Sequence, residues 1–233
     1  MLDATSLGNR WTILAVSVVI RSCAIPVAWK VLPAEQPGSW RPHWEGLLNE
    51  LGKAVPPEWD VLVLADRGLY ARWLWDAIRA WDWHPFLRIN VGSKARVPGE
   101  ENFAWISRWV PTPGTSWQGN VECFASKKGR VNGTLLMHWE PGYASAWIIL
   151  TDLEPEEALV SWYGLRTWIE GGFKDAQTRT VGLAAQQNAE GKQCGTAVVG
   201  DGSRAVLVRE SGMPGGGGVR GAVSATRAWC AVA

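Results

Sequence analysis

The stretch Val61-Leu62-Val63-Leu64-Ala65-Asp66-Arg67-Gly68 decides how the rest of the chain is interpreted. A run of aliphatic residues with β-branching, followed by a glycine-containing turn, is typical of a strand that is buried on both faces of a sheet. Asp66 then lies at the carboxyl end of that strand, and ligands collect at this edge of an open α/β sheet. An aspartate in this position also commonly caps the helix that follows. The presence of Asp3 upstream and Glu170 downstream favours a functional role over capping alone.

Length and composition are typical of a globular protein with one sizeable core. The chain has 233 residues, of which 47% are hydrophobic and 19% are charged, and its formal net charge is +1. This charge provides no overall basic field, so a nucleic-acid partner would have to bind to local patches. The four cysteines include no Cys-x-x-Cys pair, which argues against a zinc site and a disulfide framework. We therefore expect a cytoplasmic protein with no membrane partner, because the apolar run over residues 11–20 is too short to span a bilayer.

The residue types are unevenly distributed along the chain. Sixteen of the 17 Trp and 12 of the 13 Pro lie before residue 170, whereas 11 of the 26 Gly lie after residue 178. The change in composition falls near Gln177. Residues 179–233, which include the run Pro214-Gly215-Gly216-Gly217-Gly218, have too little apolar periodicity to pack like the body. We expect them to form a poorly ordered, glycine-rich tail.

Two β-branched runs near the amino terminus predict an antiparallel hairpin. They cover residues 11–20 and 24–31 and are separated by a short polar turn. Asp3 is expected on a further strand that leads into this hairpin.

Helical spacing of apolar residues predicts two helices on either side of the strand that ends at Asp66. The first follows Pro42 and is expected to end at Gly52 and Pro56-Pro57, and the second covers about residues 70–81. Residues 86–91 alternate between apolar and polar side chains, as in a strand. The expected order is therefore three strands, helix, strand, helix, strand.

The region over about residues 92–151 predicts a β-rich insertion. Its short β-like runs are broken by Pro, Gly and Asn at intervals of about 8 to 12 residues, a spacing typical of small all-β units. The runs cover residues 104–110, 121–125, 134–139 and 146–150. Lys94, Arg96, Lys127, Lys128 and Arg130 give this insertion local positive charge, which is equally consistent with a solvated loop face.

A helix is predicted after the insertion, with an N-cap at Thr151-Asp152 and Pro155 in its first turn. At about 100° per residue, a line of polar side chains falls within an arc of about 80°, and apolar side chains cover the opposite side. The polar line consists of Tyr163, Arg166, Glu170, Lys174 and Gln177. It is either a solvated face or a surface that handles phosphate groups, for which a Tyr and an Arg beside a carboxylate are suited.

Asp3, Asp66 and Glu170 suit one chemical task. Hard divalent cations such as Mg²⁺ bind oxygen ligands and keep open positions for water and phosphate. Two or three converging carboxylates can hold a pair of such ions about 3.5 to 4 Å apart for in-line phosphoryl displacement. The expected order of strands and helices, with acids at these places, resembles the ribonuclease H-like fold, which is a mixed α/β sheet flanked by helices.

Three separated motifs resemble the DDE transposases of bacterial insertion sequences. They are Asp3-Ala4-Thr5, Asp66-Arg67-Gly68 and Tyr163-x2-Arg166-x3-Glu170, and they occur in the order expected for the group with a Tyr-x2-Arg-x3-Glu-x6-Lys signature. That group also carries a β-rich insertion before the last acid. The resemblance covers about residues 1–178, which would form the ribonuclease H-like catalytic domain.

The resemblance implies a role for each matching residue. Asp3, Asp66 and Glu170 would be the catalytic triad and would bind two Mg²⁺ or Mn²⁺ ions. The residues expected to contact DNA are Arg67, Tyr163, Arg166, Lys174 and Gln177. A Trp of the insertion would stack on a base drawn out of the duplex. The partners would be double-stranded DNA, as transposon ends and target, and a second copy of the chain in a synaptic complex.

The sequence also departs from the family pattern. Gln177 stands where the signature has Lys, although Lys174 lies one turn earlier on the same face. Little precedes Asp3, and the glycine-rich tail stands where family members carry helices. We therefore expect a truncated copy from a decayed element, in which end cleavage and strand transfer are impaired.

Two other functions fit the sequence. A non-catalytic DNA-binding remnant would interfere with full-length copies of the transposase. A sugar-binding module would use the flat faces of some of the 17 Trp, but many of these fall at core spacing.

Overall fold

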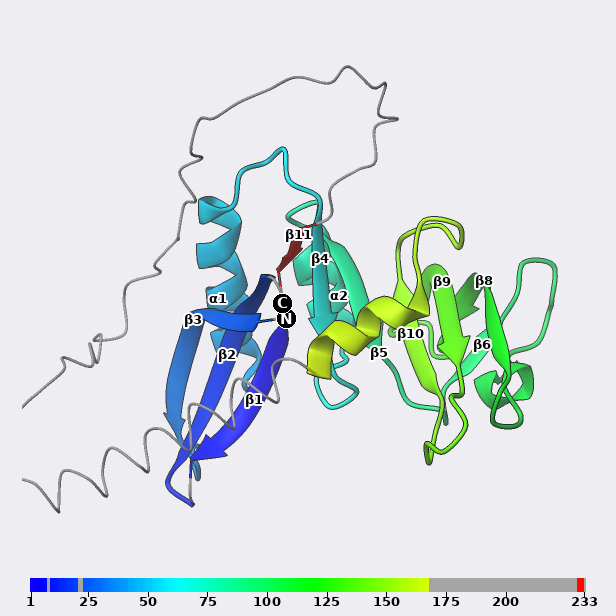
Figure 1. Ribbon diagram of the computed structural model, residues 1–233, viewed down its shortest axis with the longest axis horizontal. Helices are drawn as coiled ribbons and strands as arrows, with labels where there is room; N and C mark the ends of the chain where they lie inside the picture. The colour runs from blue at the N-terminus through cyan, green and yellow to red at the C-terminus, as the bar shows by residue number, and fades with distance from the viewer. Residues whose placement is uncertain (8, 21–22, 168–229, 233) are drawn as a thin grey trace, which may run out of the picture.

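The computed structural model describes residues 1–7, 9–20, 23–167 and 230–232. This part of the chain forms a mixed sheet in the order β3-β2-β1-β4-β5-β10-β9-β8-β6-β7, and β11 also pairs with β4 (Figure 1). The strands are β1 (Leu2–Leu7), β2 (Trp11–Ile20), β3 (Cys23–Pro33), β4 (Val61–Ala65), β5 (His84–Arg88), β6 (Lys94–Arg96), β7 (Ala104–Trp105), β8 (Ser116–Cys123), β9 (Val131–His138), β10 (Trp147–Thr151) and β11 (Cys230–Val232). The helices are α1 (Arg41–Ala54), α2 (Arg72–Arg79) and the 3₁₀ helices η1 (Ile106–Trp109) and η2 (Val160–Arg166). The predicted mixed α/β class and the order of its first seven elements are confirmed.

Strand β4 is buried on both faces, as its continuous aliphatic run predicts. Val61, Val63 and Ala65 belong to a core that includes buried residues of α1 and α2. Leu62 and Leu64 point to the other face and pack in a second core with Tyr163 of η2. Burial of each large aliphatic side chain contributes about 1.5–3 kcal/mol, so β4 anchors both cores.

Helix α1 forms where the apolar spacing predicts it, with Trp44, Leu47, Leu48 and Leu51 buried. The helix ends before Pro56-Pro57, as expected, but Gly52 does not stop it, because α1 continues to Ala54. Gly52 instead allows close packing: a Cβ atom at this position would lie 2.2 Å from the Trp81 ring. The glycine is therefore a contact residue within the helix, and not a stop signal.

The predicted hairpin of β2 and β3 is confirmed, and β1 pairs with β2 along its whole length. Strand β1 also pairs with β4 in parallel, through Leu2 and Ala65. This register determines the site, since the residues that follow these two are Asp3 and Asp66.

The region after β5 is β-rich, and its last strand, β10, pairs antiparallel with β5 in the same sheet. The expected strand over residues 104–110 is wrong in most of its length. Only Ala104–Trp105 is a strand, and η1 follows it. Ile106, the first residue of η1, and Val110, the residue that follows η1, are both buried.

The start predicted for the last helix is also wrong. Thr151 is the final residue of β10, and the Asp152 carboxylate is bound by Arg79 and His84, so neither residue caps a helix. Helix η2 begins at Val160 instead. Glu170, Lys174 and Gln177 lie outside the described residues.

Most of the expected tail also lies outside the described residues. Cys230–Val232 do not fit the expectation of a poorly packed tail, because they form β11 and pair in parallel with Val61–Val63 of β4. No helix in the described part of the chain is both long and apolar enough to cross a membrane.

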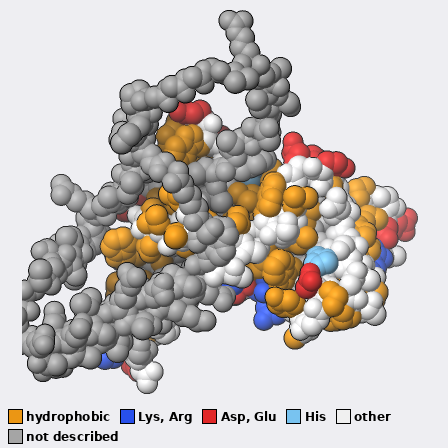
Figure 2. All heavy atoms as spheres, viewed as in Figure 1, with side chains coloured by type: hydrophobic (Ala, Val, Ile, Leu, Met, Phe, Trp, Pro, Cys, Tyr) orange, Lys and Arg blue, Asp and Glu red, His pale blue; other side chains and the backbone are white. Residues whose placement is uncertain are grey.

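The surface view agrees with the small net charge. On the face in Figure 2, hydrophobic side chains are spread over the described surface, and the Lys and Arg side chains visible there form no continuous basic patch.

Candidate active site

Asp3 and Asp66 lie beside one another because β1 and β4 are parallel neighbours in the sheet. Arg166, the last residue of η2, bridges the two carboxylates. Its Nη2 atom lies 3.7 Å from Asp3 Oδ1 and 3.5 Å from Asp66 Oδ2. The structure thus brings together two predicted metal ligands and one predicted phosphate-binding residue.

Asp66 is surrounded by donors on several sides. Its Oδ1 atom accepts a hydrogen bond of 2.7 Å from the Arg67 backbone N–H and one of 3.1 Å from the Tyr163 hydroxyl. Arg88 at the end of β5 lies farther away, with its Nη1 atom 3.8 Å from Oδ1. Burial would raise the pKa of Asp66, but the Arg67 N–H, Arg166, Tyr163 and Arg88 together lower it below its usual value. The carboxylate therefore stays ionised, as a metal ligand must.

Tyr163 is only 3% exposed and is held by its neighbours. Its ring packs edge-to-face against Trp147, with the ring centroids 5.6 Å apart, and the Arg88 guanidinium lies 5.9 Å from its centroid. Burial, together with the nearby Asp66 charge, raises the pKa of Tyr163. The phenol therefore remains protonated and acts as a fixed donor to Asp66.

A cavity of about 350 Å³ opens beside these residues. Its described lining contains two arginines and three aromatic side chains but no carboxylate: Arg88, Tyr143, Trp147, Tyr163 and Arg166, with Ala144, Ser145 and Thr167 between them. Guanidinium groups bind phosphate oxygens and aromatic rings stack on bases, so the cavity fits a nucleotide unit. We call Asp3, Asp66, Arg88, Tyr163 and Arg166 the Asp66 cluster.

The donor set of the Asp66 cluster suits a hard divalent cation. Asp3 and Asp66 present carboxylate oxygens toward the same point, which is the ligand type that Mg²⁺ and Mn²⁺ prefer. Within the described residues no third Asp, Glu, His or Cys joins them. Glu170, the expected third ligand, lies outside the described residues.

The remaining predicted DNA contacts are not brought into the cluster. The Arg67 side chain is exposed, and only its backbone N–H bonds to Asp66. Lys174 and Gln177 lie outside the described residues.

Sequence reasoning did not single out Arg88 or Trp147 as members of the site. Arg88 ends a strand that is parallel to β4 and therefore lies at the same edge of the sheet as Asp66. Its place in the site could have been predicted from the pairing of these two strands. Trp147 offered no such signal, because its contact with Tyr163 depends on the packing of β10 against η2.

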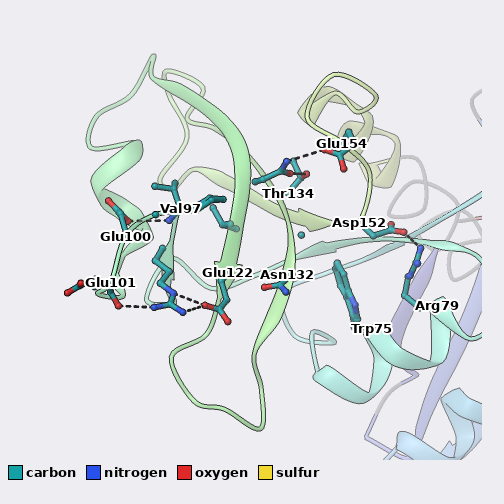
Figure 3. A pocket seen from close by; sticks show the side chains of 16 residues that line it. Trp75, Arg79, Val97, Glu100, Glu101, Glu122, Asn132, Thr134, Asp152 and Glu154 are labelled. Carbon is teal, nitrogen blue, oxygen red and sulfur yellow. Dashed lines mark hydrogen bonds and ion pairs between the residues drawn. The ribbon is translucent and has the colours of Figure 1, made fainter.

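A larger cavity of about 880 Å³ lies near the other end of β5 (Figure 3). It is lined by Arg79 and Asp152, which bind one another, and by four glutamates, of which Glu100 and Glu122 form ion pairs. Glu122 is paired with Arg96 and Arg130, and Glu100 is paired with Arg108. We call Arg79, His84 and Asp152 the Asp152 cluster. Its paired charges indicate a structural role.

No protein-family model matches the chain, and no curated protein sequence matches it. The case for a function therefore depends on the geometry of the Asp66 cluster and on the motifs that meet there.

Proposed function

We propose that the chain is a metal-dependent DNA phosphoryl-transfer enzyme of the DDE transposase type, with a ribonuclease H-like catalytic domain. One observation carries this proposal. Residues from three motifs that are far apart in the sequence meet at one point, where Arg166 bridges Asp3 and Asp66 and Tyr163 binds Asp66. A purely structural Asp66 would need a cap or an ion pair, but not a second carboxylate beside it.

Each residue of the Asp66 cluster has a role in this proposal. Asp3 and Asp66 would hold Mg²⁺ or Mn²⁺, together with Glu170. The bound ions would supply Lewis-acid stabilisation of the phosphoryl oxygens. Tyr163 fixes the orientation of Asp66 through its 3.1 Å hydrogen bond. Arg166 offsets the repulsion between the two carboxylates when no cation is bound.

The arginines would act on the substrate. In the proposed reaction, a water oxygen or a 3′-hydroxyl attacks phosphorus in line, and the opposite P–O bond breaks. Negative charge is spread over the phosphoryl oxygens in the transition state, where fixed cationic donors are most effective. Arg88 and Arg166 line the cavity beside Asp66 and are suited to this task.

The proposal includes an impaired reaction. Gln177 lacks the charge of the signature Lys, and end recognition depends on many phosphate contacts. We expect slow, non-specific nicking without efficient strand transfer.

Nicking of a supercoiled plasmid tests the proposal. We expect nicked product with Mg²⁺ or Mn²⁺, no product in a chelator, and loss of the activity in Glu170→Gln. Nicking that persists in the chelator would refute the mechanism. DNA binding without metal-dependent nicking would favour the second candidate, a non-catalytic DNA-binding remnant.

A further inference from the structure

Three polar side chains in the β-rich region after β5 are joined by two short hydrogen bonds. Ser116 Oγ lies 2.7 Å from His138 Nδ1, and His138 Nε2 lies 2.8 Å from Glu140 Oε2. None of the three belongs to the Asp66 cluster. A hydroxyl, an imidazole and a carboxylate in this order are the parts of an activated nucleophile, in which the carboxylate orients the base and the base takes the proton of the hydroxyl. We call Ser116, His138 and Glu140 the Ser116 triad.

The strand register holds the hydroxyl against the imidazole. Ser116 is the first residue of β8, His138 is the last residue of β9, and the two are directly paired. Paired residues of antiparallel strands project from the same face of the sheet, with Cβ atoms about 4.5–5.5 Å apart. Beyond this pair, the Trp139 N–H donates to the Thr115 carbonyl at 3.0 Å. The contact is therefore set by two paired strands and not by a loop.

Glu140 lies two residues after His138, in the turn that follows β9. Two hydrogen bonds hold this turn. The Tyr143 N–H donates to the Glu140 carbonyl at 3.2 Å, and the Trp139 indole N–H donates to the Tyr143 carbonyl at 2.9 Å. The Glu140 side chain is 61% exposed, so its position depends on the backbone of the turn, which keeps the carboxylate within reach of the imidazole.

The carboxylate decides which nitrogen of His138 carries the proton. An ionised carboxylate only accepts hydrogen bonds, so in the neutral imidazole the Nε2 atom donates to Glu140. The Nδ1 atom then has the lone pair that accepts a hydrogen bond from the Ser116 hydroxyl. The Oγ proton therefore points at a base, which is the arrangement that general-base catalysis needs.

The Ser116 triad can be reached by a small molecule. Ser116 is exposed, and the His138 side chain is 29% exposed. On the other side of His138, Trp147 of β10 is its paired residue, so its ring projects from the same face of the sheet. An ester that reacts at Ser116 would have this aromatic side chain on the same face for its apolar part.

We propose that Ser116 is a nucleophile that is acylated by small esters with a good leaving group, with His138 as its general base and Glu140 as the positioning residue. This inference goes beyond the proposed function, because the reaction needs neither a metal ion nor DNA. Ser116 Oγ attacks the carbonyl carbon, an Oγ–C bond forms, and the bond from that carbon to the leaving oxygen breaks. The Oγ proton passes to His138 Nδ1 and then to the leaving oxygen, so the products are acyl-Ser116 and an alcohol or phenol.

Acetylation by 4-nitrophenyl acetate tests the proposal. The full chain is incubated with this ester in a chelator and without DNA, samples are quenched in acid, and peptide mass spectrometry measures the acetyl group on each serine. Ser107 is the internal control, because it is also exposed but is not bonded to His138, whose two ring nitrogens bind other groups. We expect Ser116 to be acetylated at least about 10²-fold faster than Ser107, the lower end of what general-base catalysis contributes.

Variants assign the roles within the triad. His138→Gln should lower the rate at Ser116 to that of Ser107, and Glu140→Ala should lower it about 10-fold. Glu140→Gln keeps an acceptor oxygen for Nε2–H and should recover part of this loss. Ser107→Ala is the matched control and should leave the rate at Ser116 unchanged. Thermal denaturation confirms that each variant is folded before its rate is compared.

Three results would overturn the proposal. The first is an equal rate of acetylation at Ser116 and Ser107 in the wild type. The second is a folded His138→Gln variant that is acetylated at Ser116 as fast as the wild type. The third is acetylation of His138 in place of Ser116, which would show that the imidazole is itself the nucleophile.

Discussion

Two carboxylates, Asp66 and Asp152, lie near opposite ends of β5 and differ in how closely the neighbouring cations bind them. At the carboxyl end, Arg88 faces Asp66, and the side chain of Asp66 remains 36% exposed. At the amino end, Arg79 binds Asp152 (Figure 3), whose side chain is 10% exposed, and His84 binds the same carboxylate. The two partners of Asp152 bind its carboxylate directly, although Asp152 lines the larger cavity, whereas the side chain of Asp66 is more exposed and its arginines lie farther away.

The contact distances show the same difference. His84 Nδ1 lies 3.1 Å from Asp152, and Arg79 is in direct contact with it. The two arginines nearest to Asp66 lie 3.5 and 3.8 Å away, beyond ordinary hydrogen bonds. Charge near an acid is therefore not a sign of function by itself. Function is indicated where cations lie near an acid without binding it directly, as Arg88 and Arg166 lie near Asp66, while the Arg67 N–H and the Tyr163 hydroxyl donate to its Oδ1 atom.

The largest expected difference between the two clusters is in activity. Asp66→Asn should lower metal-dependent nicking by at least about 10²-fold, because one anionic ligand is lost and little else changes. Asp152→Asn should leave the nicking rate within about 3-fold of the wild type, since Asp152 is held at the other end of β5. Both rates are measured on the same plasmid at equal folded concentrations.

Equal loss of activity in the two variants would end the distinction between the clusters. Metal affinity, followed by calorimetry, provides an independent control, because only Asp66→Asn should weaken it.

The second difference concerns packing near the amino end of β5. Gly52→Ala should lower the free energy of unfolding by about 1–3 kcal/mol, because its Cβ would overlap the Trp81 ring, three residues before His84. Gly46→Ala, in the same helix, has nothing within 4 Å of the added atom. It should raise the free energy of unfolding by about 0.5–1 kcal/mol, through helix propensity alone.

Chemical denaturation of both glycine variants gives the measurement. A Gly52→Ala variant as stable as Gly46→Ala would show that Trp81 can move aside and that this region is less tightly packed than the contact implies.

A third difference appears in stability when the acids themselves are changed. Asp152→Asn should cost about 1–2 kcal/mol, because Arg79 and His84 lose a mostly buried anionic partner. Asp66→Asn should change the free energy of unfolding by less than about 1 kcal/mol, since its ion pairs are long and partly solvated. Thermal denaturation at neutral pH measures both. A larger loss in Asp66→Asn would identify Asp66 as the structural carboxylate.

Much of this arrangement follows from local patterns in the sequence. Period and burial predict α1, β2 and the strand that ends at Asp66, because each places one apolar face or run against a core. Asp66 could also be predicted, since it follows the carboxyl end of β4 and a carboxylate there projects out of the core, whereas Asp3 lies near the amino end of β1 and was indicated by its motif. The Tyr163 and Arg166 motif indicated the same location before the fold was known.

Local pattern fails where distant residues decide the outcome. Asp152 has the sequence context of an N-cap, but its carboxylate binds Arg79 and His84, which lie in another part of the chain, and not the start of a helix. Gly52 has the context of a helix stop, but Trp81 requires a residue without a side chain there. Arg88 enters the site only because β5 is parallel to β4. All three depend on tertiary contacts, which short windows of sequence do not contain.

The smallest expected difference is in the pH dependence of stability. The pKa of Asp66 is lowered in the folded protein: burial opposes this shift, but the Arg67 N–H, Arg166, Tyr163 and Arg88 outweigh it. Below the unfolded pKa of about 3.9, the unfolded chain binds a proton at this position more readily than the folded one. The stabilisation is therefore fully present above that value and is lost as the pH falls through the lower, folded pKa. Because the side chain is 36% exposed, the amplitude should stay below about 1 kcal/mol.

The measurement is the free energy of unfolding of wild type and Asp66→Asn between about pH 7 and pH 3. The difference between the two free energies of unfolding should be constant above about pH 5. Below about pH 4 the wild type should lose stability relative to Asp66→Asn, because the variant has no carboxylate to protonate. A shift in the other direction would mean that burial outweighs the surrounding donors, and Asp66 would then belong with closed, structural acids.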